Sequence, residues 1–296
     1  MSGQGEPHGG GPVVITPSLL REWALPEPGA SKYGRGQVLA VGGARGTPGA
    51  VLLAGLAALR VGAGRLTVAV ADSVAAASAV AVPEAGVVGL PEDADGSVTG
   101  GGARLSRAVT RADAVLVGSG LDEPEGTVAL LSEVLRTVGD DTSVVLDAFA
   151  LGVLPGMGDA VGPLRGRLVL TPNEAEAARL LGEPDGDVDV ERAVPEVAER
   201  FGAVVTCRNL VAAPDGRRWQ VAAGHSGLGT SGSGDVLAGA VLGLLARGAT
   251  PEQAACWATH AHAAAGDRLT ARVGRLGFLA RELVDQLPAV ITELGV

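Results

Sequence analysis

The stretch Gly229-Thr230-Ser231-Gly232-Ser233-Gly234-Asp235 leads directly into the apolar segment Val236–Leu245. Glycines let a backbone approach an anion closely, and the first turn of a following helix adds unpaired N–H groups and the positive end of its dipole. The stretch therefore predicts a phosphate-binding loop at the start of a helix. A carboxylate at the mouth of such a loop can accept a proton from an attacking hydroxyl group, so Asp235 is the first candidate for a catalytic base.

The pair Gly234-Asp235 also has a purely structural interpretation. Most Gly-Asp pairs are turns or helix N-caps, in which the carboxylate accepts backbone hydrogen bonds and does no chemistry. Taken alone, the pair favours this capping interpretation over a catalytic one. The rest of the chain supplies the context that separates the two.

Short apolar runs rich in β-branched residues alternate with longer stretches rich in alanine and leucine. This alternation predicts parallel strands with helical crossovers, and hence a three-layer α/β/α sandwich around a mostly parallel central sheet. The predicted strands are Gln37–Val41, Leu66–Val70, Ala114–Val117, Ser143–Leu146, Leu168–Leu170 and Ala203–Thr206. The predicted helices are Pro48–Val61, Thr127–Val138, Asn173–Leu181, Val188–Glu199, Val236–Leu245 and Pro251–Leu269.

The pattern changes toward the C-terminus. Leu210–Ala213 and Gln220–Ala223 flank the turn Pro214-Asp215-Gly216, which predicts a β-hairpin, and three helices then close the chain. The length of 296 residues and the lack of a long linker indicate a single domain over residues 31–296. Residues 1–30 carry no motif, and we expect them to form a flexible segment.

Glycines and polar residues follow four of the predicted strands. Each instance alone is weak evidence, because glycine after a strand usually makes a turn and Thr-Pro often caps a helix. The carboxyl ends of parallel strands share one edge of a sheet, where ligands bind in folds of this class. The recurrence therefore predicts a binding site at that edge. The stretches are Gly42-Gly43, Gly118-Ser119-Gly120-Leu121, Asp147 and Thr171-Pro172-Asn173.

Composition excludes several other classes of protein. A net charge of −10 argues against nucleic-acid or anionic-membrane partners, and no segment has the roughly 20 apolar residues of a membrane span.

Cys207 and Cys256 lack metal-ligand spacing, which predicts a reduced, cytoplasmic protein. A Walker A phosphate loop is excluded, because it ends in Gly-Lys-Ser/Thr and the sole lysine, Lys32, does not lie in such a sequence. His260 and His262 lie two residues apart in a predicted helix, so they do not form a metal-binding pair.

The motifs together resemble one known family. They are, in chain order, Gly36-Gln37-Val38-Leu39-Ala40-Val41-Gly42-Gly43, Thr47-Pro48-Gly49-Ala50-Val51-Leu52-Leu53-Ala54, Arg60-Val61-Gly62-Ala63-Gly64, Gly118-Ser119-Gly120-Leu121, Leu170-Thr171-Pro172-Asn173 and Gly229–Asp235. From about Tyr33 to Leu287 the chain is similar to the ADP-dependent NAD(P)H-hydrate dehydratases of the ribokinase-like superfamily. The resemblance implies an enzyme that removes water from the S epimer of hydrated NADH or NADPH, with ADP as the phosphoryl donor and Mg²⁺ as cofactor.

The resemblance also implies roles for individual residues. Asp235 would be the base on the ring hydroxyl, which becomes a good leaving group once it is phosphorylated. The positions that line the hydrated-nicotinamide side match Ala50, Gly120 and Asn173. Gly234 would also touch the AMP portion of the nucleotide. The amides that would hold the phosphoryl group in transit belong to Ser231, Gly232, Ser233 and Gly234.

Two positions near the site depart from the family pattern. Asn173 stands where many relatives carry histidine, so it keeps a hydrogen-bonding group without a protonatable one. With Glu176 it forms an Asn-x-x-Glu pair similar to the superfamily element that organises Mg²⁺ and water. Arg208 stands near the place of a Lys-Gly pair and would supply the positive charge for the nucleotide, although a guanidinium group is not interchangeable with an ammonium group.

Two other functions stay open from the sequence. A kinase of the same superfamily, acting on a vitamin-precursor alcohol, would use the same Asp235 with ATP and release a phosphorylated product. A catalytically silent nucleotide-binding homologue, suggested by the missing lysine, would bind ADP without turnover. The family resemblance further implies a homo-oligomer such as a tetramer, and a functional link to an NAD(P)H-hydrate epimerase.

Overall fold

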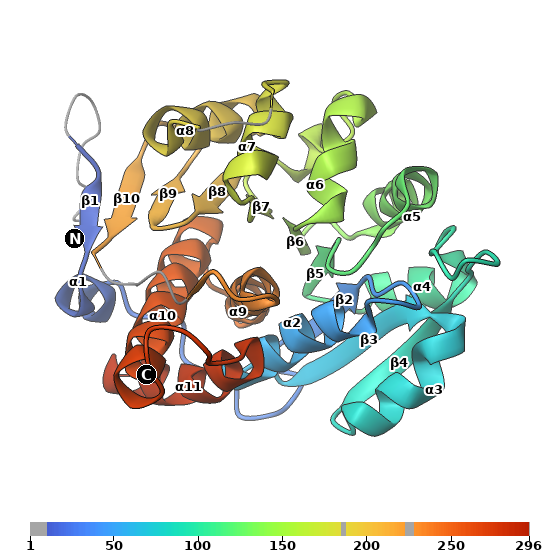
Figure 1. Cartoon of the computed structure of the whole chain (residues 1–296), viewed down its shortest axis with the longest axis horizontal. Coiled ribbons are helices and arrows are strands. Elements are labelled where there is room, and N and C mark those ends of the chain that lie inside the picture. The colour runs from blue at the N-terminus through green and yellow to red at the C-terminus, as the bar shows by residue number, and fades with distance from the viewer. Residues whose placement is uncertain (1–10, 185–187, 223–227, 296) are drawn as a thin grey trace.

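The computed structural model describes residues 11–184, 188–222 and 228–295 (Figure 1). In this part of the chain one ten-stranded sheet has the order β1-β10-β9-β8-β7-β6-β5-β2-β3-β4. The strands are β1 (Val13–Ile15), β2 (Gln37–Val41), β3 (Arg65–Ala71), β4 (Ala85–Leu90), β5 (Ala114–Val117), β6 (Ser143–Leu146), β7 (Leu168–Leu170), β8 (Val204–Cys207), β9 (Leu210–Ala212) and β10 (Arg218–Val221).

The strands from β2 to β8 pair with one another in parallel. β9 is antiparallel to both β8 and β10, and β1 returns parallel to β10 at the sheet edge. This arrangement confirms the predicted mostly parallel sheet. Strands β9 and β10 form the predicted hairpin. Residue 223, the last residue of the predicted second strand, lies outside the described residues.

Helices cover both faces of the sheet, as Figure 1 shows. In the described part of the chain they are α1 (Pro17–Glu22), α2 (Pro48–Arg60), α3 (Asp72–Ala81), α4 (Gly102–Val109), α5 (Pro124–Thr137), α6 (Phe149–Val153), α7 (Glu174–Leu181), α8 (Val190–Phe201), α9 (Ser233–Ala246), α10 (Pro251–Arg272) and α11 (Ala280–Glu293), with 3₁₀ turns at Leu154–Met157 and Gly162–Leu164. The apolar side chains of α2, α9, α10 and α11 form one core, and those of α4 to α8 form a second core on the opposite face.

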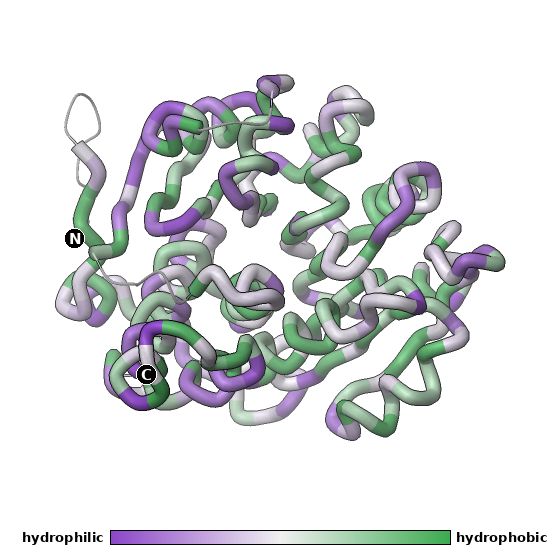
Figure 2. The backbone as a smooth tube through the Cα atoms, viewed as in Figure 1, coloured by the Kyte–Doolittle hydropathy of each residue, from purple (hydrophilic) through white to green (hydrophobic). Residues whose placement is uncertain are grey.

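Strand β2 shows how one sequence serves both cores. Val38 and Ala40 face the first core, whereas Leu39 and Val41 face the second. Alternate side chains point to opposite faces of a strand, so a strand covered on both faces must be apolar throughout. Figure 2 shows the central strands in the hydrophobic colour, with hydrophilic residues concentrated on the outer helices and loops.

Helix α9 is packed directly against α2 because glycines replace larger residues at the contact. A Cβ atom added at Gly239 would lie 2.0 Å from the carbonyl oxygen of Ala54, and one at Gly243 would lie 2.5 Å from that of Ala58. No side chain larger than hydrogen fits such an approach. The close contact fixes the start of α9, which carries the glycine loop, relative to the start of α2.

The N-terminal segment, which was expected to be flexible, contains regular secondary structure. Over its described residues it forms β1 and α1, and Leu20 is fully buried. Gln253 and Trp257 of α10 donate hydrogen bonds of 3.0 Å to the carbonyl oxygen of Trp23, whose ring stacks on Trp219 with centroids 6.0 Å apart. The expectation for residues 1–30 is therefore wrong for Val13 to Trp23, because these contacts hold the segment against the sheet edge and α10.

The sequence does not predict several of the observed elements. The edge strand β4 contains Gly86 and Gly89 and is only partly buried, so it lacks the continuous apolar run of a central strand. Helix α4 begins among the glycines of 100–102 and is only eight residues long. Over the described residues, no helix has the length and apolar character required to span a lipid bilayer.

Candidate active site

Asp235 lies in the first turn of α9. Gly232 occupies the N-cap position with a φ of 88°, in the left-handed region that favours glycine, and Ser233 begins the helix. The predicted junction of loop and helix is confirmed. Because Gly232 holds the capping position and Asp235 is the third helical residue, the interpretation of Asp235 as an N-cap residue is wrong.

The backbone amides at this junction are open to a ligand. The Ser233 N–H donates to the carbonyl oxygen of Thr230 at 3.1 Å, and those of Gly234 and Asp235 have no acceptor in the described part of the chain. A Cβ atom added at Gly234 would meet nothing within 4 Å, so the space beside the loop is free. Unpaired amides at a helix N-terminus suit a phosphoryl group.

The half-buried carboxyl group of Asp235 has its pKa raised to about 6. Burial is the largest cause, and the negative charges of Asp147 and Glu176 act in the same direction, while a hydrogen bond from Ser119 lowers the pKa. A carboxylate with a pKa close to neutral can take up a proton far more readily than an exposed one. The environment of Asp235 therefore suits a general base.

Asp147 lies buried next to this site, directly after β6. It accepts hydrogen bonds from the hydroxyl groups of Ser119, at 2.9 Å, and Thr171, at 2.7 Å, which follow β5 and β7. Burial raises the pKa of Asp147 and the two hydroxyl groups lower it. The polar residues that follow neighbouring strands thus meet at the carboxyl edge of the sheet, as the sequence predicts.

The side chain of Ser233 is buried and contacts α10. Its buried hydroxyl group shares a hydrogen bond of 2.9 Å with Nε2 of His262 on α10. Burial lowers the pKa of His262 to about 4, so the ring is neutral at pH 7. The hydroxyl group of Ser233 is therefore engaged within the protein, and no pattern in the sequence pairs Ser233 with His262.

Ala50 and Gly120 are brought together as expected. A Cβ atom added at Gly120 would lie 3.2 Å from the Cβ of Ala50 and 2.4 Å from the carbonyl oxygen of Thr47. The Thr47 hydroxyl group donates to the carbonyl oxygen of Gly120 at 2.9 Å. Gly120 has a φ of 76°, so both its conformation and its neighbours require glycine.

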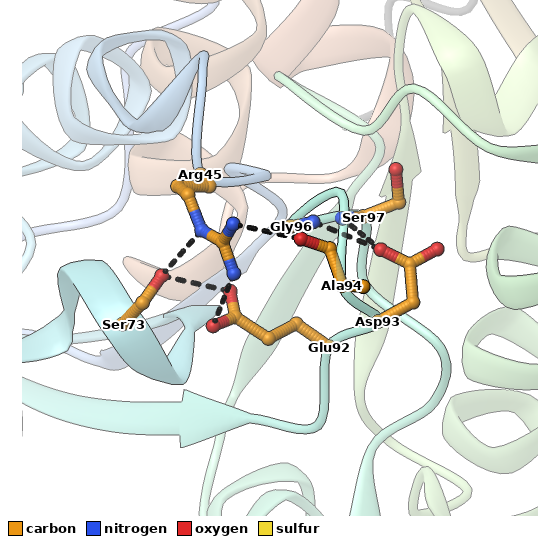
Figure 3. A network of polar contacts seen from close by, with 7 residues as sticks. All are labelled: Arg45, Ser73, Glu92, Asp93, Ala94, Gly96 and Ser97. Carbon is orange, nitrogen blue, oxygen red and sulfur yellow. Dashed lines mark hydrogen bonds and ion pairs between the residues drawn. The ribbon is translucent and has the colours of Figure 1, made fainter.

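The loop that follows β2 is held in place by Arg45, as Figure 3 shows. Its guanidinium group donates to the hydroxyl group of Ser73 at 3.2 Å, to the carbonyl oxygen of Ala94 at 3.0 Å and to Glu92 at 3.1 Å. Ser73 in turn donates to Glu92 at 2.8 Å. These bonds tie the loop that carries Thr47 to the segment after β4, and no motif in the sequence marks them.

Asn173 and Glu176 form a capping box at the start of α7. The Asn173 side chain accepts from the Glu176 N–H at 2.9 Å, and the Glu176 carboxylate accepts from the Asn173 N–H at 2.8 Å. Burial raises the pKa of Glu176, and the charge of Asp147 adds to this effect. The Asn-x-x-Glu pair therefore has a local structural role, and its carboxylate lies within electrostatic reach of Asp147 and Asp235.

Arg208 lies at the end of β8 with a φ of 56°, unusual for a residue with a side chain. Its exposed guanidinium group forms an ion pair of 2.7 Å with Glu174, the first residue of α7. Arg208 thus lies beside the helix that Asn173 caps. No contact between Arg208 and the loop of Asp235 is present among the described residues.

The order of the sheet and the glycine loop at its carboxyl edge define the ribokinase-like class of α/β proteins. A ribokinase-like superfamily protein of Enterococcus faecalis shares this fold with a TM-score of 0.80 and 24% identity, over 98% of this chain and 99% of that one. A solved ADP/ATP-dependent NAD(P)H-hydrate dehydratase of Bacillus subtilis, co-crystallised with ATP and Mg²⁺, has a TM-score of 0.76 and 28% identity over 95% of this chain and 98% of its own.

Sequence comparison gives the family within this class. A family model described as NAD(P)H-hydrate dehydratase matches residues 38–289. The ADP-dependent (S)-NAD(P)H-hydrate dehydratase of Xanthomonas campestris pv. campestris is 42% identical over 96% of this chain and 98% of its own length. This chain belongs to the NAD(P)H-hydrate dehydratase family. A bifunctional NAD(P)H-hydrate repair enzyme of Salinibacter ruber is 38% identical over 92% of this chain, which spans 51% of that longer protein.

Proposed function

We propose that this chain dehydrates the S epimer of hydrated NADH or NADPH and converts ADP to AMP and phosphate. The observation that carries the proposal is the juxtaposition of a half-buried carboxylate, whose pKa is raised to about 6, with the open amides of the α9 N-terminus. A phosphoryl group bound at those amides would lie beside Asp235. Membership of the family supports the same assignment.

The chemistry proceeds in two steps. The oxygen of the ring hydroxyl group attacks the terminal phosphorus of ADP while Asp235 accepts the hydroxyl proton. The bond between this phosphorus and the bridging oxygen breaks, and AMP leaves. The ring nitrogen then supplies an electron pair, the carbon–oxygen bond breaks with loss of phosphate, and loss of a ring proton completes the dihydronicotinamide. The first step makes the second possible because phosphate is a far better leaving group than hydroxide.

The binding residues are proposed from the same geometry. The amides of the α9 N-terminus would hold the phosphoryl group, with Gly234 next to AMP. Ala50 and Gly120, which lie in contact distance of each other, would line the nicotinamide side together with Asn173. Arg208 would approach the nucleotide from the end of β8. The loop residues in this proposal are Ser231, Gly232, Ser233 and Gly234.

Mg²⁺ is the proposed cofactor. The described residues contain no group of three or more His, Cys, Asp or Glu side chains arranged to hold a metal ion. Mg²⁺ needs no such cage, since one or two carboxylates usually suffice when phosphates and water complete its ligands. Glu176 fits this role through water, because the mutual repulsion of Glu176, Asp147 and Asp235 would be relieved by a cation. When bound, Mg²⁺ would neutralise phosphate charge.

Three wider features are proposed with the activity. A partner epimerase would supply the S epimer, as the bifunctional name of the Salinibacter ruber relative suggests. A homotetramer is proposed from the family resemblance alone. A cytoplasmic location is proposed from Cys207 and Cys256, which are buried and not bonded to each other, while the net charge of −10 disfavours nucleic acid and anionic membranes as partners.

The test mixes the protein with hydrated NADH, Mg²⁺ and either ADP or ATP, and follows the return of dihydronicotinamide absorbance. We expect recovery that depends on ADP and falls by about 10²–10⁴-fold in Asp235→Asn, the usual contribution of a general base. The matched control is Asp141→Asn, which changes an exposed carboxylate outside the site and should leave the rate unchanged. No recovery with either nucleotide would overturn the proposal, and a stable phosphorylated product would indicate a kinase.

A further inference from the structure

A cavity lies at the amino ends of the sheet strands, at the opposite end of the strands from the candidate active site. It has a volume of about 470 Å³ and opens at the amino ends of β2 and β3, beneath α4. Gln37 and Arg65, the first residues of these two strands, both line it. The residues of the candidate active site follow the carboxyl ends of β5, β6 and β7, so the two sites share no residue.

The rim of this cavity is strongly basic. Arg65, Arg104, Arg107 and Arg111 all line it, and no acidic residue does. Arg104 and Arg107 lie three residues apart, on one face of α4, and Arg111 follows the end of that helix. This concentration of positive charge is notable in a chain whose net charge is −10.

In the described part of the chain none of these four arginines forms an ion pair, whereas Arg45, Arg192 and Arg217 each pair with a carboxylate.

Tyr33 and Asp113 lie next to the rim. Arg65 contacts the Tyr33 ring, 5.3 Å from the ring centroid, and its hydroxyl oxygen at 3.4 Å. The nearby carboxylate of Asp113 is already an acceptor for the Gln37 N–H at 2.7 Å. No ion pair joins this carboxylate to any of the four arginines among the described residues.

The walls of the cavity below this rim are mixed in character. Val88 and Ala108 supply partly exposed apolar surface, and Gln37 and Thr67 add polar side chains. Guanidinium groups match phosphate oxygens with two parallel hydrogen bonds each, so several of them together suit an anion with more than one phosphate group. The size of the cavity leaves room for more than an inorganic ion, since small-molecule sites span roughly 300–1,000 Å³.

We propose that this cavity, lined by Arg65, Arg104, Arg107 and Arg111, is a binding site for a diphosphate or triphosphate group, separate from the active site. The ligand is either the inorganic anion or a nucleotide that carries the same group. The inference depends only on this cavity, and it stands whether or not the chain has the proposed dehydratase activity.

The test titrates the whole protein with inorganic pyrophosphate and, separately, with cytidine diphosphate, by calorimetry at low ionic strength. We expect each ligand to bind the unmodified protein, and the double variant Arg107→Gln/Arg111→Gln to weaken pyrophosphate binding at least about tenfold, a typical loss for charge-assisted hydrogen bonds. Arg200→Gln, which removes an exposed arginine on α8, is the matched control and should bind as the unmodified protein does.

Each outcome of the titration bears on the inference. Binding that weakens in the double variant and weakens with added salt supports the site. Tighter binding of cytidine diphosphate would then identify a nucleotide as the ligand, and equal binding would identify the phosphate groups alone. Absence of binding, or equal binding by the double variant, overturns the inference. Because all four arginines are exposed, a melting curve should show both variants folded.

Discussion

Ser119 Oγ lies 2.9 Å from the carboxylate of Asp147, to which it donates a hydrogen bond at the ends of two adjacent strands. Thr171 donates a second bond to the same carboxylate. Asp147 is thus satisfied by neutral hydroxyl groups, and no ion pair with it is present among the described residues. Its negative charge consequently acts on Asp235 and contributes to the raised pKa of that residue.

The first prediction concerns Asp147→Asn. Removal of this negative charge should lower the pKa of Asp235 below its value of about 6. A general base works only when it is deprotonated, so activity is lost as the pH falls through its pKa. The acid limb of the profile of kcat/KM against pH should therefore move to lower pH in the variant.

The control for this shift is Asp141→Asn, which removes an exposed carboxylate and should leave the acid limb in place. An acid limb that stays at the same pH in Asp147→Asn would show that Asp147 does not act on the base. Loss of activity without a shift of the acid limb would instead show that Asp147 serves to hold the strand ends together.

The sequence predicts an element correctly where the residues of one short segment are enough to determine its structure. The glycines before Asp235 predict a loop and a helix start, and the central strands are apolar because both faces are covered. Asp147 and Thr171 were also predicted to share an edge, since parallel strands end together.

Other features depend on contacts between distant segments. Ser233 and His262 are 29 residues apart, and Arg45 reaches Glu92 across 47 residues. No local pattern specifies such pairs. The partly exposed strand β4 and the segment from Val13 to Glu22 are likewise stabilised by their neighbours in the sheet, so their own sequences indicate little.

The second prediction compares two glycines that both lie in helices. Gly239→Ala should destabilise the protein by about 1–3 kcal/mol, because its Cβ atom would meet the backbone of Ala54 and push α9 from α2. Gly152→Ala is the matched control, since its Cβ atom would meet nothing within 4 Å and alanine favours the helix by about 0.5–1 kcal/mol. Urea unfolding should therefore give changes of opposite sign, and equal changes would contradict the close packing of α9 on α2.

The third prediction concerns the loop that Arg45 holds. Arg45→Met should loosen this loop and with it Thr47, whose hydroxyl group bonds to Gly120. We expect the KM for the hydrated dinucleotide to rise about three- to tenfold, the effect of losing roughly 1 kcal/mol of positioning. The KM for ADP should change little, because the loop lies on the nicotinamide side of the proposed site.

The control for Arg45 is Arg60→Met, which breaks an exposed ion pair with Asp285 at 3.0 Å. Such surface pairs contribute about 0–1 kcal/mol, and this one lies outside the proposed site. Both KM values should therefore match those of the unmodified protein. An unchanged KM for the hydrated dinucleotide in Arg45→Met would show that the loop keeps its position without the network of Figure 3.

The last prediction concerns Arg208, whose positive charge is proposed to replace that of a lysine. Arg208→Ala should raise the KM for ADP by about tenfold, the usual effect of losing a charge-assisted hydrogen bond to phosphate. Arg208→Gly should raise it equally and yet unfold at a higher temperature than Arg208→Ala, because glycine adopts the φ of 56° without strain. Steady-state kinetics and thermal unfolding measure the two effects separately.

Glu174→Gln separates the charge of Arg208 from its ion pair. The variant removes the partner at 2.7 Å and keeps the guanidinium group, so ADP affinity should stay the same or improve as Arg208 becomes free to reach the nucleotide. If Arg208→Ala leaves the KM for ADP unchanged, Arg208 serves only its ion pair with α7. The positive charge for the nucleotide would then have to come from bound Mg²⁺, and the dependence of the rate on Mg²⁺ should be correspondingly steep.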